Sequence, residues 1–129
     1  MIYIAAEKNF ENRIKAWFQS VGIYPAGFPS HKMTVPQVGW YIKYWAGSQF
    51  TKSGIPDILV CVNGYFVAVE VKGPNGTASD LQIKNIKMIN ASNGFAFVLY
   101  PSAFDEFKTF IDGLIHDTFN RDSIPMIWK

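Results

Sequence analysis

The sequence predicts a single α/β domain, with helices packed on a mixed β-sheet, over all 129 residues. Three observations predict it: a helical stripe of apolar residues near the N-terminus, an Asn-Gly turn between two apolar strands, and a strand–helix–strand order over residues 65–100 that should form a right-handed parallel crossover. The composition, 49% hydrophobic and 16% aromatic, is sufficient to build a buried core.

The first helix is expected over residues 6–21. Its apolar residues recur at helical spacing and form one stripe: Phe10, Ile14, Trp17, Phe18 and Val21. Gly22 then supplies a C-terminal stop. The stripe predicts that one side of this helix packs on the sheet.

The next segment, residues 24–52, has weaker patterning. Three prolines exclude a long helix there: Pro25, Pro29 and Pro36. The run "GWYIKYW" is rich in aromatic and β-branched residues and predicts a strand from Trp40 to Trp45. Residues 48–56 are expected to form a loop.

A β-hairpin is expected from residues 57–62 and 65–71. Asn63 and Gly64 join the two strands, and this dipeptide favours a two-residue turn because both positions must tolerate a positive φ. Such a turn fixes the register of the hairpin.

Two more helices flank a last strand. Ser79 and Gln82 form a capping-box pattern, which predicts the start of a helix that Gly94 ends. The apolar run "FAFVLY" predicts a buried strand over residues 95–100, and a last helix is expected from Ser102. The remaining tail matches neither a helix nor a strand pattern.

The register places two carboxylates side by side. Asp57 lies opposite Glu70 in a non-hydrogen-bonded pair, whose Cα atoms approach to about 4.5 Å. Because side chains alternate, both emerge with Lys72 on one face. The opposite face should be buried: Ile58, Val60, Val62, Val67, Val69 and Val71. Opposed like charges destabilise a sheet unless a cation lies between them or one holds a proton, so the pair suits Mg²⁺ or Mn²⁺.

A surface cluster in which Lys72 neutralises Glu70 is the structural alternative. The neighbours on this face are apolar and are expected to lie under a helix: Leu59, Cys61, Phe66 and Ala68. Cys61 is accordingly expected to be a buried structural thiol. Charges at the rim of a buried layer favour a functional site over a solvated face.

The stretches "GIPDILV", "YFVAVEVKG" and "SDLQ" resemble the virus-type replication-repair nuclease (VRR-NUC) domain of the PD-(D/E)XK superfamily, which is related to Holliday-junction resolvases and restriction enzymes. The resemblance runs from Glu7 to about Tyr100. Each motif is short, and their combination and spacing make the resemblance specific. It implies a restriction-endonuclease-like αβββαβ core, here with an extra C-terminal helix, and a metal-dependent DNA endonuclease.

The resemblance also assigns roles at the carboxylate pair. It implies that Asp57 and Glu70 are ligands of a Mg²⁺ or Mn²⁺ ion and that the Val71 carbonyl is a further ligand. Lys72 would orient or activate the attacking water.

Two more residues match the family pattern but have competing explanations. Glu7 matches the acidic residue of the family's first helix, and Glu11, one helical turn on, is a competitor. Gln82 matches a family glutamine and also satisfies a plain capping role.

Candidate contacts to DNA come from the segment before the hairpin. Three lysines there could neutralise phosphates: Lys32, Lys43 and Lys52. Lys43 stands out because a lysine inside so apolar a strand requires an anion. Tyr41 and Tyr44 could stack on unpaired bases. Packing against the core and against a partner is the alternative for these aromatic residues, and it is favoured for Trp40 and Trp45.

The expected partner is DNA. The net charge of +2 permits an anionic partner without requiring one. The resemblance suggests branched DNA such as four-way junctions, cut by a two-fold homodimer; the alternative is a non-cleaving nucleic-acid-binding or assembly protein on a nuclease scaffold. The single cysteine and the lack of a signal-peptide pattern favour the cytoplasm, and the family suggests a phage or prophage origin.

Overall fold

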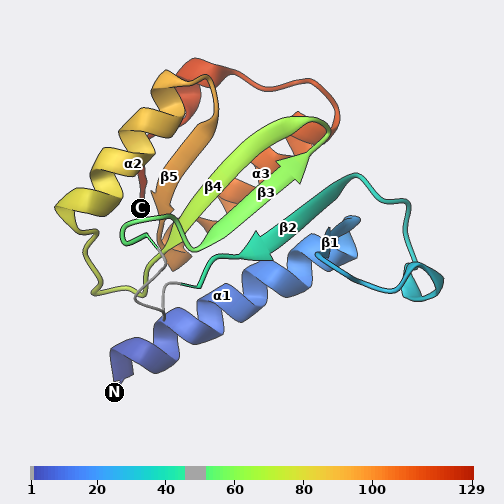
Figure 1. The fold of residues 1–129 in the computed structure, drawn as a ribbon, viewed down its shortest axis with the longest axis horizontal. Coiled ribbons are helices and arrows are strands. Elements are labelled where there is room, and N and C mark those ends of the chain that lie inside the picture. Colours follow the sequence, from blue (N-terminus) through green and yellow to red (C-terminus); the bar gives the residue numbers. More distant parts are fainter. Residues whose placement is uncertain (1, 46–51) are drawn as a thin grey trace.

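The computed structural model describes residues 2–45 and 52–129, which form a six-stranded sheet and three α-helices (Figure 1). The elements are α1 (Ile2–Ser20), β1 (Ile23–Pro25), β2 (Gly39–Lys43), β3 (Ile58–Val62), β4 (Tyr65–Val71), α2 (Asp80–Ala91), β5 (Phe95–Leu99), α3 (Phe104–Ile115) and β6 (Ile127–Trp128). This is the predicted mixed α/β architecture. None of the described helices has the length and apolar character needed to cross a membrane.

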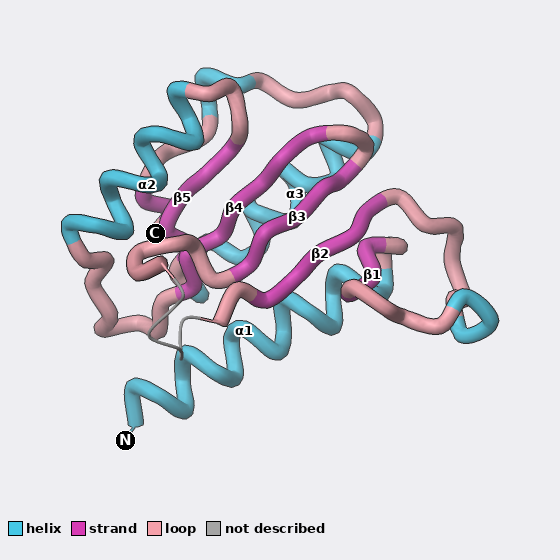
Figure 2. The backbone as a smooth tube through the Cα atoms, in the orientation of Figure 1, coloured by secondary structure: helices cyan, strands magenta, loops and turns pink. Residues whose placement is uncertain are grey.

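The strands lie side by side in chain order, from β1 to β6. Figure 2 shows the first five of this order, β1 to β5. The central strands β2, β3 and β4 are antiparallel, whereas β1 runs parallel to β2, and β5 and β6 run parallel to β4. One face packs against α1 and α3 in a large core that includes Ile14, Phe18 and Phe107. The other face packs against α2 through a smaller core around Ile86.

The predicted hairpin and its register are confirmed. Asn63 and Gly64 have φ angles of 49° and 84°. Val62 pairs with Tyr65 and Ile58 with Val69, so the next residue outward, Asp57, meets the level of Glu70. The face predicted to be buried is buried, with every member at most 1% exposed: Ile58, Val60, Val62, Val67, Val69 and Val71.

The prediction for the opposite face of the hairpin is wrong in part. Ala68 is buried, but Phe66 is 44% exposed and Cys61 is exposed. The reason is that α2 contacts β4 and β5 and leaves much of β3 uncovered. Cys61 is therefore not the buried structural thiol that its apolar neighbours suggested.

The helices match the predictions, with shifted ends. The first begins at Ile2 instead of residue 6, because no glycine or proline precedes its apolar stripe. The last begins at Phe104, after a 3₁₀ turn at Pro101–Ala103. The strand expected at Trp40–Trp45 spans Gly39–Lys43. The loop expected over residues 48–56 lies partly outside the described residues.

Candidate active site

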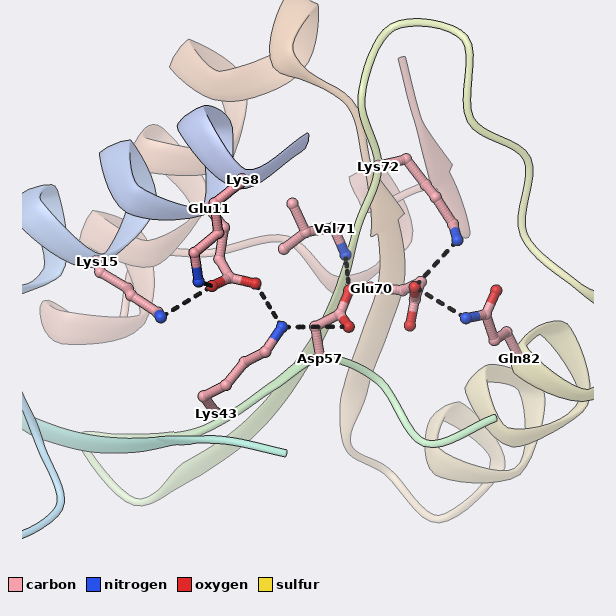
Figure 3. Close-up of polar contacts among 9 residues, drawn as sticks. All are labelled: Lys8, Glu11, Lys15, Lys43, Asp57, Glu70, Val71, Lys72 and Gln82. Atoms are coloured by element: carbon pink, nitrogen blue, oxygen red, sulfur yellow. Dashed lines mark hydrogen bonds and ion pairs between the residues drawn. The ribbon is translucent and has the colours of Figure 1, made fainter. Parts of the chain in front are cut away.

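The sheet brings the predicted acidic and basic residues to one edge. Asp57 precedes β3, whereas Glu70 and Lys72 lie at the end of β4, and Figure 3 shows these three with Gln82 of α2. Both strands reach this edge because the Asn-Gly turn at their other end fixes their alignment.

Asp57 has its two oxygens in different environments. Its Oδ2 accepts a hydrogen bond of 2.8 Å from the backbone N–H of Val71. Its Oδ1 lies 3.5 Å from the ammonium of Lys43, and the side chain is 25% exposed. The backbone of β4 thus holds this carboxylate in place and leaves Oδ1 directed at a cation.

Glu70 is the more deeply buried of the pair, with 2% of its surface exposed. Its Oε2 accepts a hydrogen bond of 3.0 Å from Gln82 Nε2 and lies 3.3 Å from Lys72 Nζ. Its Oε1 is buried without a hydrogen-bond partner among the described residues. Burial, followed by the neighbouring Asp57 carboxylate, raises the pKa of Glu70 to about 8 even though Lys72 opposes the shift.

Gln82 contributes to the cap of α2 and also contacts Glu70. Its side-chain oxygen accepts from the Ser79 backbone N–H at 2.8 Å, and its own N–H donates to Ser79 Oγ, which completes the capping box. Its amide nitrogen at the same time donates to Glu70. The helix cap therefore fixes the amide that orients the buried carboxylate.

The two acidic residues of α1 lie in different places. Burial raises the pKa of Glu7, with Lys72, Asp57 and the backbone of Gly73 as the nearby influences, so Glu7 lies at the edge that carries the carboxylate pair. Glu11, only 4% exposed, instead pairs with Lys8, Lys15 and Lys43, and these contacts lower its pKa to about 2 against the effect of burial. Of the two candidate acidic residues of the first helix, Glu7 thus lies beside the carboxylate pair, whereas Glu11 is neutralised by lysines.

The residues expected to contact DNA are dispersed. Lys43 finds its anions within the protein, at Glu11 and Asp57. Lys52 is exposed, and its carbonyl accepts from the Tyr44 hydroxyl at 3.0 Å. Lys32 is exposed in a 3₁₀ turn of the β1–β2 connection, at the far end of the molecule from the N-terminus of α1 (Figure 1).

One prediction about the aromatic residues of this segment is wrong. Tyr41 is 6% exposed and packs on Phe18 with ring centroids 5.4 Å apart, so it is unavailable for base stacking. Trp40 and Trp45 are 44% and 75% exposed, so they do not pack in the core of one chain, and their packing against a partner stays a prediction. The cause is the register of β2, which pairs Tyr41 with Val60 on the core face and Trp40 with Cys61 on the uncovered face.

The carboxylate pair fits a divalent cation. The mutual repulsion of the pair is relieved either by a proton on Glu70, which its raised pKa favours and which allows a hydrogen bond with Asp57, or by a cation, and oxygen ligands suit Mg²⁺ or Mn²⁺. A cation would also satisfy the buried Glu70 Oε1. Within the described ranges, no cluster of three or more His, Cys, Asp or Glu side chains is arranged to hold a metal. Backbone carbonyl and water ligands would have to complete the shell.

The model of the VRR-NUC domain family matches residues 7–103. The chain belongs to the VRR-NUC family. This match runs from Glu7, within α1, to Ala103, the residue before α3, and includes every residue at the carboxylate edge. Searches of curated proteins and of solved structures gave no match.

Membership of the VRR-NUC family implies a nuclease-type function and DNA binding. One contact at the site was missed by sequence reasoning, namely the bridge from Glu11 through Lys43 to Asp57. The available signal was the lysine in an apolar strand, which correctly indicated a nearby anion but not which one.

Proposed function

We propose that this protein is a metal-dependent DNA endonuclease that hydrolyses phosphodiester bonds with its Asp57–Glu70 pair. The observation that carries the proposal is the buried Glu70 Oε1, which has no hydrogen-bond partner among the described residues and lies beside a second carboxylate. A buried oxygen of this kind is costly unless a ligand satisfies it. Membership of a nuclease family makes a catalytic cation the natural ligand.

Mg²⁺ or Mn²⁺ would be held by Asp57, Glu70 and the Val71 carbonyl, with water completing the shell. Such an ion, when bound, polarises a phosphoryl oxygen and makes a coordinated water more acidic. Glu7 lies at the same edge and adds a further negative group. Gln82 keeps the Glu70 carboxylate oriented through its 3.0 Å hydrogen bond.

Lys72 is the chain's own electrophilic group at this site. Its ammonium lies 3.3 Å from Glu70 and its side chain is only 14% exposed, so it is held close to the carboxylates. A positive charge fixed there stabilises the attacking water in its deprotonated form and the negative charge that develops on the phosphoryl group. Lys72 therefore acts on the nucleophile or the transition state, and no histidine base is required.

The substrate we propose is branched DNA such as a four-way junction. A junction offers two symmetry-related strands for cutting, whereas one chain supplies a single Asp57–Glu70 pair. Two copies related by a two-fold axis would supply the second site, in line with the resemblance to resolvases. A phage or prophage gene would place this activity in the cytoplasm of the host.

The test is a cleavage panel of single-stranded, flap, duplex and four-way DNA with Mg²⁺ and with Mn²⁺, beside a measured solution mass. Asp57→Asn, Glu70→Gln and Lys72→Ala should each abolish cutting. Asp105→Asn is the matched control, because that carboxylate lies on α3 with its side chain 97% exposed. Unimpaired cutting by Lys72→Ala would contradict the roles assigned here. If the protein bound the DNAs of the panel but cut none of them, the non-cleaving alternative would be favoured.

A further inference from the structure

A second ion-pair cluster lies directly against the proposed metal site (Figure 3). Its centre is Glu11 of α1, which is 4% exposed and pairs with Lys8, Lys15 and Lys43. Lys43, from the end of β2, also lies 3.5 Å from Asp57 Oδ1. The Lys43 ammonium thus links Glu11, a buried anion without a role in the proposed mechanism, to Asp57, a proposed metal ligand.

Lys43 and a metal ion would need the same oxygen of Asp57. The other oxygen, Oδ2, already accepts a 2.8 Å hydrogen bond from the Val71 N–H. Oδ1 is therefore the oxygen with the most free acceptor capacity, and the Lys43 ammonium already lies beside it. The Glu11 carboxylate holds this ammonium in place, so a competing positive charge is built into the site.

The charges of the two clusters favour a cation and a phosphate together. Once a bound cation has displaced any proton on Glu70, four carboxylates and four ammonium groups balance: Glu7, Glu11, Asp57, Glu70, Lys8, Lys15, Lys43 and Lys72. A divalent cation alone would then leave the clusters positive by two units. A phosphodiester carries one negative charge and would halve that excess.

We propose that Lys43 is a positioning residue that competes with the metal for Asp57 in the free protein and turns to a DNA phosphate when DNA binds. Metal and DNA consequently bind with positive cooperativity, because each removes a charge conflict that the other meets. This inference deepens the proposed function and rests on its metal site. The phosphate contact of Lys43 would therefore depend on the metal, whereas that of a surface lysine would not.

Lys43→Met is the informative variant, and Lys15→Met is its matched control. Both lysines pair with Glu11 and have similarly buried side chains, 33% and 26% exposed. Within the described part of the chain, Lys15 contacts Glu11 and not Asp57. Either variant leaves Glu11 with two lysines, so neither strands a buried charge.

The first measurement is the Mn²⁺ concentration that raises the Tm by a fixed amount above the metal-free value, in the absence of DNA, because this stabilisation grows with the ratio of the Mn²⁺ concentration to its Kd. Lys43→Met should lower this concentration about tenfold, a typical size for coupling between two sites, whereas Lys15→Met and Lys43→Arg should stay near wild type. An unchanged or higher concentration for Lys43→Met would overturn the inference. Asp57→Asn tests the metal site independently of the role of Lys43. A full Mn²⁺ response in that variant would refute the metal site itself.

The second measurement is reciprocal. In a Lys72→Ala background, which should not cut, the affinity for a labelled four-way DNA is measured by fluorescence anisotropy with and without Mn²⁺. Mn²⁺ should raise the affinity about tenfold, and adding Lys43→Met should abolish most of that gain, whereas adding Lys15→Met should preserve it. Equal gains in both double variants would overturn the coupling through Lys43 while leaving the proposed nuclease site intact.

Discussion

Two glutamates of this protein are buried to nearly the same degree and behave in opposite ways. Glu11 is 4% exposed and has a pKa of about 2, whereas Glu70 is 2% exposed and has a pKa of about 8. The difference comes from their partners. Three lysines surround Glu11, whereas Glu70 meets one lysine, a glutamine and a second carboxylate. Burial alone does not mark a functional acid, but burial with unmet charge does.

The largest expected difference between the two is in cleavage. Glu70→Gln should lower the cleavage rate about a thousandfold, since it removes a charged ligand of the proposed metal ion. Glu11→Gln should lower it about tenfold, because Glu11 acts only through Lys43. Single-turnover rates on the best substrate of the panel, with Mn²⁺, provide the measurement. Equal losses in the two variants would mean that both glutamates belong to the reacting centre.

Stability without metal should reverse that order. Glu11→Gln should lower the free energy of unfolding by about 2 kcal/mol, less than for a fully buried ion pair because its lysines are partly exposed. Glu70→Gln should leave the free energy unchanged below about pH 4.5 and raise it increasingly between about pH 4.5 and pH 8, since glutamine resembles the protonated Glu70 that the raised pKa favours in the folded protein and cannot ionise in the unfolded chain. Urea unfolding in EDTA tests both, with Asp105→Asn as the control. A loss of stability in Glu70→Gln would show that its lysine contact outweighs the repulsion from Asp57.

The pH dependence of stability should also separate the two glutamates. The raised pKa of Glu70 means that the folded protein keeps a proton that the unfolded chain loses, so its contribution is complete below about 4.5 and falls as the pH rises to about 8. The lowered pKa of Glu11 has the opposite sign, and its contribution is lost as the pH falls from about 4.5 to about 2. In metal-free buffer, Glu70→Gln should flatten the decline between pH 4.5 and pH 8. A decline that persists unchanged would place the titrating group elsewhere.

The half of this comparison that concerns Glu70 could be predicted from sequence, and the half that concerns Glu11 could not. Asn63 and Gly64 determine a two-residue turn, and counting one position beyond the last strand pair, Ile58–Val69, brings Asp57 to the level of Glu70. Lys43 and Glu11 lie 32 residues apart, and their contact depends on how α1 crosses β2. Local periodicity carries no information on that crossing angle.

The same reason explains the error in β2. A long connection separates β2 from β3, so no turn fixes which alternate residues face the core, and Tyr41 was wrongly expected to be available for stacking. The short strands β1 and β6 have three and two residues, too few for a periodic pattern. Tertiary pairing alone makes them strands.

A smaller effect on cleavage than that of Glu70→Gln is expected at Gln82, which caps α2 and donates a hydrogen bond to Glu70. Ser79→Ala removes the capping oxygen alone and should cost about 1 kcal/mol in stability with nearly normal cleavage. Gln82→Ala removes the cap and the 3.0 Å bond to Glu70, and should lower cleavage by a further factor of about ten to a hundred. Comparing the two variants isolates the orientation of Glu70 from the stability of α2. Similar cleavage in both would reduce Gln82 to a cap.

The smallest effect is expected at Lys8, the most exposed partner of Glu11. Its side chain is 59% exposed and lies 3.1 Å from a carboxylate that two other lysines also contact. Lys8→Met should therefore cost no more than about 0.5 kcal/mol, the usual range for a solvated ion pair. Urea unfolding of this variant beside Glu11→Gln measures how far the lysines substitute for one another. If Lys8→Met cost as much as Glu11→Gln, the three lysines would act as one unit, and the low pKa of Glu11 would depend on the complete set.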